Sequence, residues 1–211
     1  MTRPSAPDLL ALHGVRILGF ADSAAVARRF TLDPDETHEA LLDAEARGWV
    51  THTSFAGQGG WSLTASGRAE GERRLRAELA DAGGVDEVQD VHRAFIPLNA
   101  RVQRACTDWQ LRPRAGDRLA ENDHTDARWD TAVLDELEDV ASALTTLARR
   151  LGTVLARLDG YDARFTAALE NARAGDTAWV DRTDVDSCHR VWFELHEDLI
   201  ATLGLERGVG A

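Results

Sequence analysis

Apolar residues recur three and four positions apart in three segments of the second half of the chain. The three sets are Val88, Val91, Phe95, Leu98, Val102, Ala105 and Trp109; Val133, Leu137, Val140, Leu144, Leu147, Leu151, Val154 and Leu158; and Val185, Cys188, Trp192, Leu195 and Leu199. This spacing places each set along one side of an α-helix. With a shorter helix over about 162–174, the segments predict an antiparallel helical bundle over residues 84–204.

Pro97 interrupts the first of these segments. Proline removes an amide donor, so the helix either bends there or breaks into 85–95 and 97–110. A bend would wrap the helix around the core, whereas the carbonyl group freed near Arg93 could line a pocket. The helix over 130–159 would be about 45 Å long at about 1.5 Å per residue, which is long enough to support a dimer.

The first half of the chain has a different pattern, with two short helices separated by a tight turn. Ser23 is placed to cap a helix over 24–30. Asp33 is placed to cap a second helix over 34–47, which has proline at its first position and ends before Gly48. These signals predict a helix-turn-helix.

Two strands are expected next, over 49–55 and 61–64, joined by the glycine-rich segment 56–60. The order of three helices, a hairpin and a further helix is that of a winged helix. Such a module usually places the second helix of its motif in the major groove of DNA. We therefore expect a mainly α protein: a winged helix-turn-helix with a two-stranded β-wing over 7–82, followed by the helical bundle.

Two sequence segments also resemble a known family. Gly48-Trp49-Val50 follows the predicted recognition helix, and Trp61-Ser62-Leu63-Thr64-Ala65-Ser66-Gly67-Arg68 follows the hairpin loop. Over about the first 80 residues the chain resembles MarR-type and PadR-type bacterial transcriptional regulators. The resemblance implies a homodimer that binds double-stranded DNA. Four later segments resemble actinobacterial helical regions that are described as regulator-like, some of them beside phosphoenolpyruvate-utilising enzymes. These segments are Leu98-Asn99, Asp108-Trp109-Gln110, Asn122-Asp123-His124-Thr125-Asp126 and Val191-Trp192-Phe193-Glu194-Leu195-His196-Glu197-Asp198.

The charge of the chain does not favour nucleic acid. The formal net charge is −12 at pH 7. Residues 1–82 contain 9 arginines and 12 acidic residues, and residues 83–211 contain 15 arginines and 24 acidic residues. Because phosphate neutralisation supplies most non-specific DNA affinity, a strong binder should carry a basic surface.

The predicted recognition helix shows the same conflict. Asp35, Glu39 and Asp43 share one side of the helix, and each close contact with phosphate can cost several kcal/mol. The candidate DNA-binding residues are Arg28, Arg29, Thr37, His38, Arg47 and Gln58. Two functions stay open at this point. One is a DNA-binding transcriptional regulator; the other is a winged-helix interaction module that docks on a metabolic enzyme without binding DNA.

Polar and aromatic residues beside the apolar sets suggest an effector pocket in the bundle. The aromatic walls would be Phe95, Trp109, Trp129 and Trp192, and the polar anchors would be His92, Asn99, His124 and His189. A metal site is a second hypothesis, with Asp123, His124, Asp126, His189 and His196 as ligands. His189 and His196 are two turns apart, too far to share an ion on a straight helix. In a third hypothesis these histidines are ordinary interface residues.

Other function classes have little support. No GxSxG, P-loop, GxGxxG or zincin motif is present, so we expect neither an enzyme nor a cofactor. No apolar run approaches the roughly 18 residues of a membrane span, and the N-terminus lacks the apolar segment of a signal peptide. We therefore expect a cytoplasmic protein that does not contact a membrane. Cys106 and Cys188 are expected to be free, buried thiols.

Overall fold

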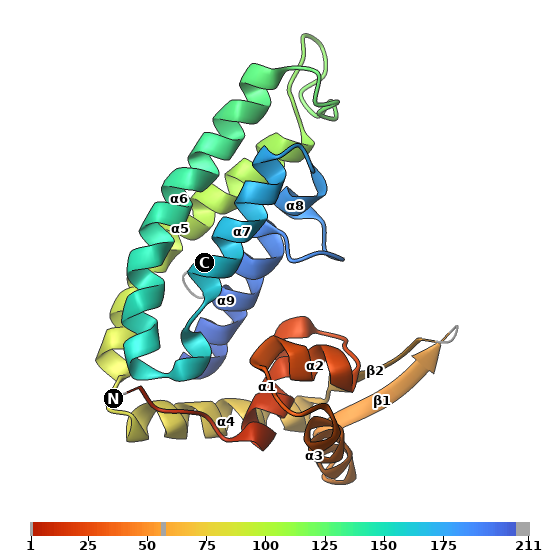
Figure 1. Ribbon diagram of the computed structural model, residues 1–211, viewed down its shortest axis with the longest axis vertical. Coiled ribbons are helices and arrows are strands. Elements are labelled where there is room, and N and C mark those ends of the chain that lie inside the picture. The colour runs from red at the N-terminus through yellow and green to blue at the C-terminus, as the bar shows by residue number, and fades with distance from the viewer. Residues whose placement is uncertain (1, 56–57, 206–211) are drawn as a thin grey trace. The chain divides into compact units, whose positions relative to one another are not determined.

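Helices make up most of the computed structural model, which describes residues 2–55 and 58–205 (Figure 1). In chain order the elements are α1 (Pro7–Leu18), α2 (Ser23–Phe30), α3 (Pro34–Ala46), β1 (Val50–Phe55), β2 (Gln58–Leu63), α4 (Ala65–Asp81), α5 (Val85–Gln110), α6 (Ala127–Val154), the 3-10 helix η1 (Ala156–Leu158), α7 (Tyr161–Arg173), α8 (Ala178–Asp181) and α9 (Cys188–Leu203). The strands form a two-stranded antiparallel sheet. The expectation of a mainly helical chain with one hairpin is confirmed.

The chain divides into two compact units. Within the described residues, the first unit comprises the chain as far as Val88, the segment Thr153–Arg157 and the segment 197–205. The second unit comprises Gln89–Gly152 and Leu158–His196. Two short segments from late in the sequence therefore belong to the N-terminal unit.

Hydrogen bonds at the helix ends of the first unit follow the sequence closely, with one exception. The carboxylate of Asp33 accepts bonds from the backbone N–H groups of Asp35 and Glu36, at 2.9 and 3.0 Å, and so caps α3. The predicted cap of α2 is wrong, because Asp22 accepts from the N–H of Ala25 at 2.7 Å. Ser23 is the first helical residue instead.

The hairpin is longer than predicted. Gly59 and Gly60 pair with Ser54 and Thr53, so residues assigned to the loop belong to β2. Trp61 also forms an isolated antiparallel bridge with Ala21, in the segment before α2. The two N–H···O distances of this bridge are 2.8 and 3.3 Å. The hairpin is therefore attached to the chain that leads into the helix pair.

Gly67 explains how α4 can start so close to the hairpin. A Cβ atom at this position would lie 1.8 Å from the carbonyl oxygen of Trp49. Glycine is thus required here by a close backbone approach. The core beside it contains the buried side chains of Leu12, Val26, Leu41, Val50 and Trp61.

The apolar sets of the second half are the buried faces of its helices. Phe95, Leu137, Leu144 and Phe165 are fully buried, whereas Leu98 is half-buried. Side-chain bonds join α5 to α6, α6 to α7, α7 to α9 and α9 to α5, and these helices lie side by side in Figure 1.

Two helix boundaries differ from the prediction. α5 continues through Pro97 without interruption, so of the two alternatives the break is wrong. Arg93 and Pro97 are both exposed, which places the carbonyl group that loses its donor on the side open to solvent. α6 ends at Val154, and the residues that follow form η1 rather than a continuation of the helix. Across residues 2–55 and 58–205, no helix combines the length and the apolar character needed to cross a lipid bilayer.

Candidate functional site

The outward side of α3 is acidic. Asp35, Glu39, Leu42, Asp43 and Ala46 are all exposed and share one side of the helix, which we call the α3 face. Leu42 lies between the carboxylates, and 40% of its surface is exposed to solvent. The helix dipole favours an acid in the first turn but not in the last, where Asp43 lies. Helix capping alone therefore does not explain the α3 face.

The predicted DNA-binding arginines differ in their surroundings. Arg47 lies 3.9 Å from the carboxylate of Asp43 and stacks over the ring of Trp49 at 5.0 Å. Arg29 is half-buried, and its positive charge acts on the buried Asp198. Arg28 is exposed, and its guanidinium makes no hydrogen bond or ion pair within the described residues. The three arginines therefore do not combine into one free basic surface.

The polar residues of α3 that were predicted to bind DNA already have hydrogen-bond partners within the protein. Thr37 is 2% exposed, and its hydroxyl donates to the carbonyl oxygen of Asp33 at 2.7 Å. The prediction that Thr37 contacts DNA is wrong, because this side chain faces the core. His38 is exposed, and its Nδ1 lies 3.0 Å from Ser23 Oγ, which accepts from Trp61 Nε1 at 3.0 Å. The side chain of Gln58 and the residues 56–57 lie outside the described part of the chain.

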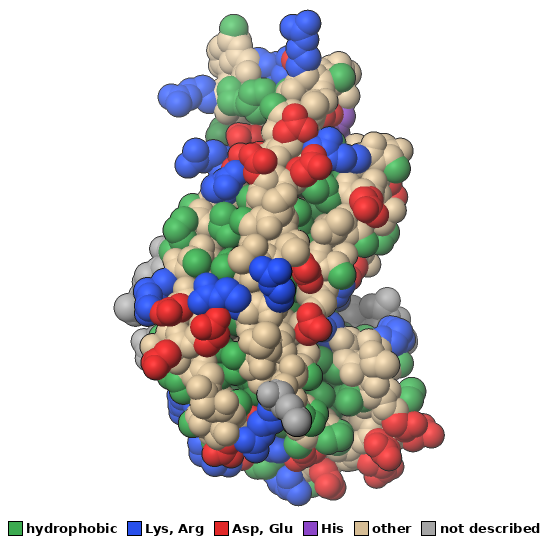
Figure 2. Space-filling model, turned by 60° about the vertical axis from the view of Figure 1, so that its left-hand side comes forward, with side chains coloured by type: hydrophobic (Ala, Val, Ile, Leu, Met, Phe, Trp, Pro, Cys, Tyr) green, Lys and Arg blue, Asp and Glu red, His purple; other side chains and the backbone are tan. Residues whose placement is uncertain are grey.

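Other arginines of the chain are paired with acidic side chains. Figure 2 shows one face of the molecule, on which acidic and basic side chains are interspersed. In the first unit, Arg3 lies 3.5 Å from Asp81 and Arg74 lies 2.8 Å from Asp8. The number of arginines in the sequence therefore overstates the positive charge that remains for a phosphate backbone.

Three of the predicted ligand-binding residues form a closed core contact. The rings of Phe95 and Trp192 stack at 4.5 Å, and Trp192 Nε1 donates to Asn99 Oδ1 at 3.0 Å. All three residues are buried. His92 is half-buried beside them, and burial lowers the pKa of its imidazole. The amide oxygen of Asn99 is thus already used within the protein.

Two further predicted residues, Trp109 and His124, lie together elsewhere in the second unit. Their ring centroids are 4.6 Å apart, and His124 Nδ1 lies 3.1 Å from a carboxylate oxygen of Asp130. They border a cavity of about 630 Å³ whose lining includes Asp176 and Asp181. Protein donors already bind both acids, since Trp179 Nε1 donates to Asp176 and Gln110 donates to Asp181.

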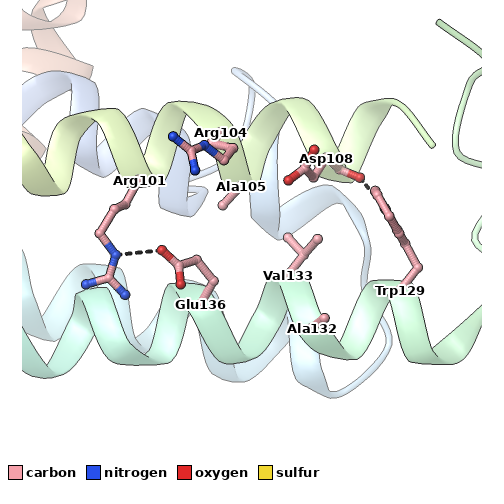
Figure 3. Close-up of a pocket in the computed structure, with 8 residues that line it drawn as sticks. All are labelled: Arg101, Arg104, Ala105, Asp108, Trp129, Ala132, Val133 and Glu136. Carbon is pink, nitrogen blue, oxygen red and sulfur yellow. Dashed lines mark hydrogen bonds and ion pairs between the residues drawn. The ribbon is translucent and has the colours of Figure 1, made fainter. Parts of the chain in front are cut away.

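The last two predicted residues lie apart from these. Trp129 borders a smaller cavity, of about 280 Å³, between α5 and α6 (Figure 3). His189 is the second residue of α9, is half-buried and lines neither cavity. The eight predicted residues are therefore distributed over separate places and do not line one pocket. Sequence reasoning missed Arg101, Arg104 and Asp108, although their spacing along α5 places them together beside the apolar set.

The five predicted metal ligands have other partners or lie apart. Asp123 accepts from Arg114 at 2.7 Å, and this bond, with those from Thr125, holds the pKa of Asp123 below its ordinary value. Asp126 accepts from Arg112. In the described ranges, no three His, Cys, Asp or Glu side chains are grouped so that they could hold a metal ion. The residues present do not support the metal hypothesis.

A buried charge cluster in the first unit was not expected from the sequence. It consists of His13, Glu78, Arg157, Asp198 and Thr202, all largely inaccessible to solvent. Arg157 donates to Glu78 at 3.1 Å, to Thr202 at 2.8 Å and to Asp198. Burial alone would raise the pKa of Asp198, but Arg157 and His13 hold it below its ordinary value. Burial lowers the pKa of His13, although Asp198, 3.0 Å from its Nε2, opposes this effect.

The two cysteines are free and buried, as predicted. Burial raises the pKa of each thiol to about 12. A protonated thiol is a poor nucleophile, so neither cysteine has the environment of a catalytic residue.

Comparison with protein-family models, curated proteins and solved structures finds no match to this chain.

Proposed function

We propose that the first unit is a winged helix-turn-helix and that the second is an antiparallel helical bundle. The order of three helices, a hairpin and a fourth helix supports the first assignment. The bridge between Ala21 and Trp61, which attaches the hairpin to the start of the helix pair, supports it further. The mutual contacts of α5, α6, α7 and α9 support the second. The resemblance to MarR-type and PadR-type proteins agrees with this architecture over the first 80 residues.

We further propose that the α3 face binds a partner protein. The observation that carries this proposal is the exposure of Asp35, Glu39 and Asp43 on the side of α3 where a winged helix would meet DNA. Carboxylates on this side repel phosphate, whereas they attract arginine and lysine side chains. Exposed Leu42 adds an apolar anchor among them. The partner therefore has a basic rim around an apolar depression; the surface of a metabolic enzyme is the candidate.

A DNA-binding transcriptional regulator is the second candidate function. The order of elements favours it, and so do Arg28, His38 and Arg47, which are all exposed. Carboxylates can also accept a hydrogen bond from the amino group of cytosine. In this candidate a homodimer would bind two half-sites about one helical turn apart. That the chain forms a homodimer and that it binds a small-molecule effector are still predictions.

A photo-cross-linking experiment separates the two candidates. Leu42 is replaced with benzoylphenylalanine in the full-length chain, and cells are irradiated. Our proposal predicts a discrete adduct that protease removes and DNase does not. Replacement of Glu170, which is exposed on α7, is the matched control and should not give that adduct. A DNase-sensitive adduct at position 42 would favour the regulator instead.

A further inference from the structure

The cavity between α5 and α6 combines an apolar floor with charges of both signs. Its volume is about 280 Å³. Ala105 from α5 and Ala132 and Val133 from α6 form the floor, and Trp129 closes one end (Figure 3). Trp129 is held in place because its Nε1 donates to the backbone carbonyl of Asp108 at 2.6 Å.

Some of the charged groups in this cavity are already neutralised. Arg101 donates to Glu136 at 2.6 Å and lies 3.8 Å from Asp139. Arg104 and Asp108 make no side-chain hydrogen bond or ion pair with the described residues, although they are four positions apart on α5. One guanidinium, whose charge also acts on Glu136, and one carboxylate therefore have no direct side-chain partner beside the apolar floor.

This pair of free charges selects the class of ligand. A ligand with only a carboxylate would pair with Arg104 but would meet the like charge of Asp108. A ligand with only an ammonium group would meet the opposite conflict. A ligand that carries both groups satisfies both residues, since guanidinium binds carboxylate through parallel hydrogen bonds and carboxylate binds ammonium.

We propose that this cavity binds a free α-amino acid with an apolar side chain. Its carboxylate pairs with Arg104, its ammonium group pairs with Asp108, and its side chain lies over Ala105 and Val133 towards Trp129. The volume agrees with a small ligand, because cavities for drug-sized molecules begin at about 300 Å³. The proposal uses α5 and α6 only, so it does not depend on the function proposed for the first unit.

Calorimetric titration of the full-length protein tests the proposal. The probes are L-leucine and L-phenylalanine, together with the amine and the carboxylic acid that lack one charged group of each. We expect saturable binding of an amino acid. Its two analogues should bind at least about tenfold more weakly, because each leaves one charged residue without a partner. No saturation by either amino acid at about 10 mM would overturn the proposal, as would equal affinity for an analogue.

Variants locate the binding to this cavity. R104Q and D108N should each weaken binding about tenfold or more. R93Q and D90N are the matched controls, because these residues pair with each other elsewhere on α5, and they should change affinity by less than about twofold. A132W fills the floor without changing charge and should abolish binding. If R104Q and D108N bound the amino acid with the same affinity as the two control variants, the location of the site would be contradicted. The comparison of analogues on the unaltered chain decides the ligand class even if a variant does not fold.

Discussion

Replacement of Arg157 with methionine tests the buried charge cluster most severely. The Arg157 side chain is inaccessible to solvent, and the carboxylates of Asp198 and Glu78 that it binds are 0% and 8% exposed. Methionine fills much of the same volume but removes the guanidinium that binds both buried carboxylates. Removing one partner of a buried ion pair typically costs about 3–5 kcal/mol. We expect R157M to lower the free energy of unfolding by this amount.

Urea denaturation followed by circular dichroism measures the effect. For a chain of this size, about 1 kcal/mol corresponds to roughly 2–4 °C in Tm, so the melting temperature should fall by roughly 6–20 °C. R173M is the control, because Arg173 binds Asp135 and Glu138 at a solvent-accessible position and should change stability by less than about 1 kcal/mol.

A double-mutant cycle isolates the interaction itself. R157M/D198N removes the cation and one of the two carboxylates that it binds, so it should be less destabilised than the sum of the single variants. If R157M were within about 1 kcal/mol of the wild type, the reasoning about buried charge would be refuted.

Three further predictions concern protonation and close packing. Because the pKa of His13 is lowered in the folded protein, the unfolded chain takes up a proton at this histidine more readily. The free energy of unfolding should therefore fall as the pH drops below about 6.5, by up to about 1.4 kcal/mol per pH unit. Urea titrations at several pH values should show a weaker dependence of stability on pH for H13N than for the wild type. G67A should destabilise by about 1–3 kcal/mol or more in thermal melts, because its Cβ would overlap the Trp49 carbonyl; a neutral result would mean that α4 moves freely. Cys106 and Cys188 should react with a thiol reagent at about pH 8 only after denaturation, and rapid native labelling would contradict their burial.

Local signals in the sequence predicted much of the fold. The spacing of apolar residues identified the buried faces of α5, α6 and α9, because one helix side must face the core. Asp33 was identified as a cap because a side-chain oxygen there has few other partners. Ser23 was misassigned because Asp22 competes for the same N–H groups, and Trp61 and His38 bind the serine hydroxyl instead.

The candidate sites depended on contacts that spacing does not encode. Thr37 was expected to face outward, but its position on α3 places it with the buried Leu41 and Ala44. Asn99 and Trp192, which are 93 positions apart in the sequence, bond to each other and so close part of the predicted pocket. The buried charge cluster combines residues from α1, α4, η1 and α9, and no local pattern relates them.

Binding of the full-length protein to its own upstream DNA, followed by fluorescence anisotropy at low salt, tests the central claim most directly. The account predicts no saturation below about 10 µM protein, because the exposed carboxylates of Asp35, Glu39 and Asp43 repel phosphate. It also predicts that D35N/E39Q/D43N binds more tightly than D86N/E121Q/E170Q, which removes the same charge at other exposed positions. Half-saturation below about 1 µM with a steep salt dependence would show that the chain binds DNA despite these carboxylates and would contradict the account.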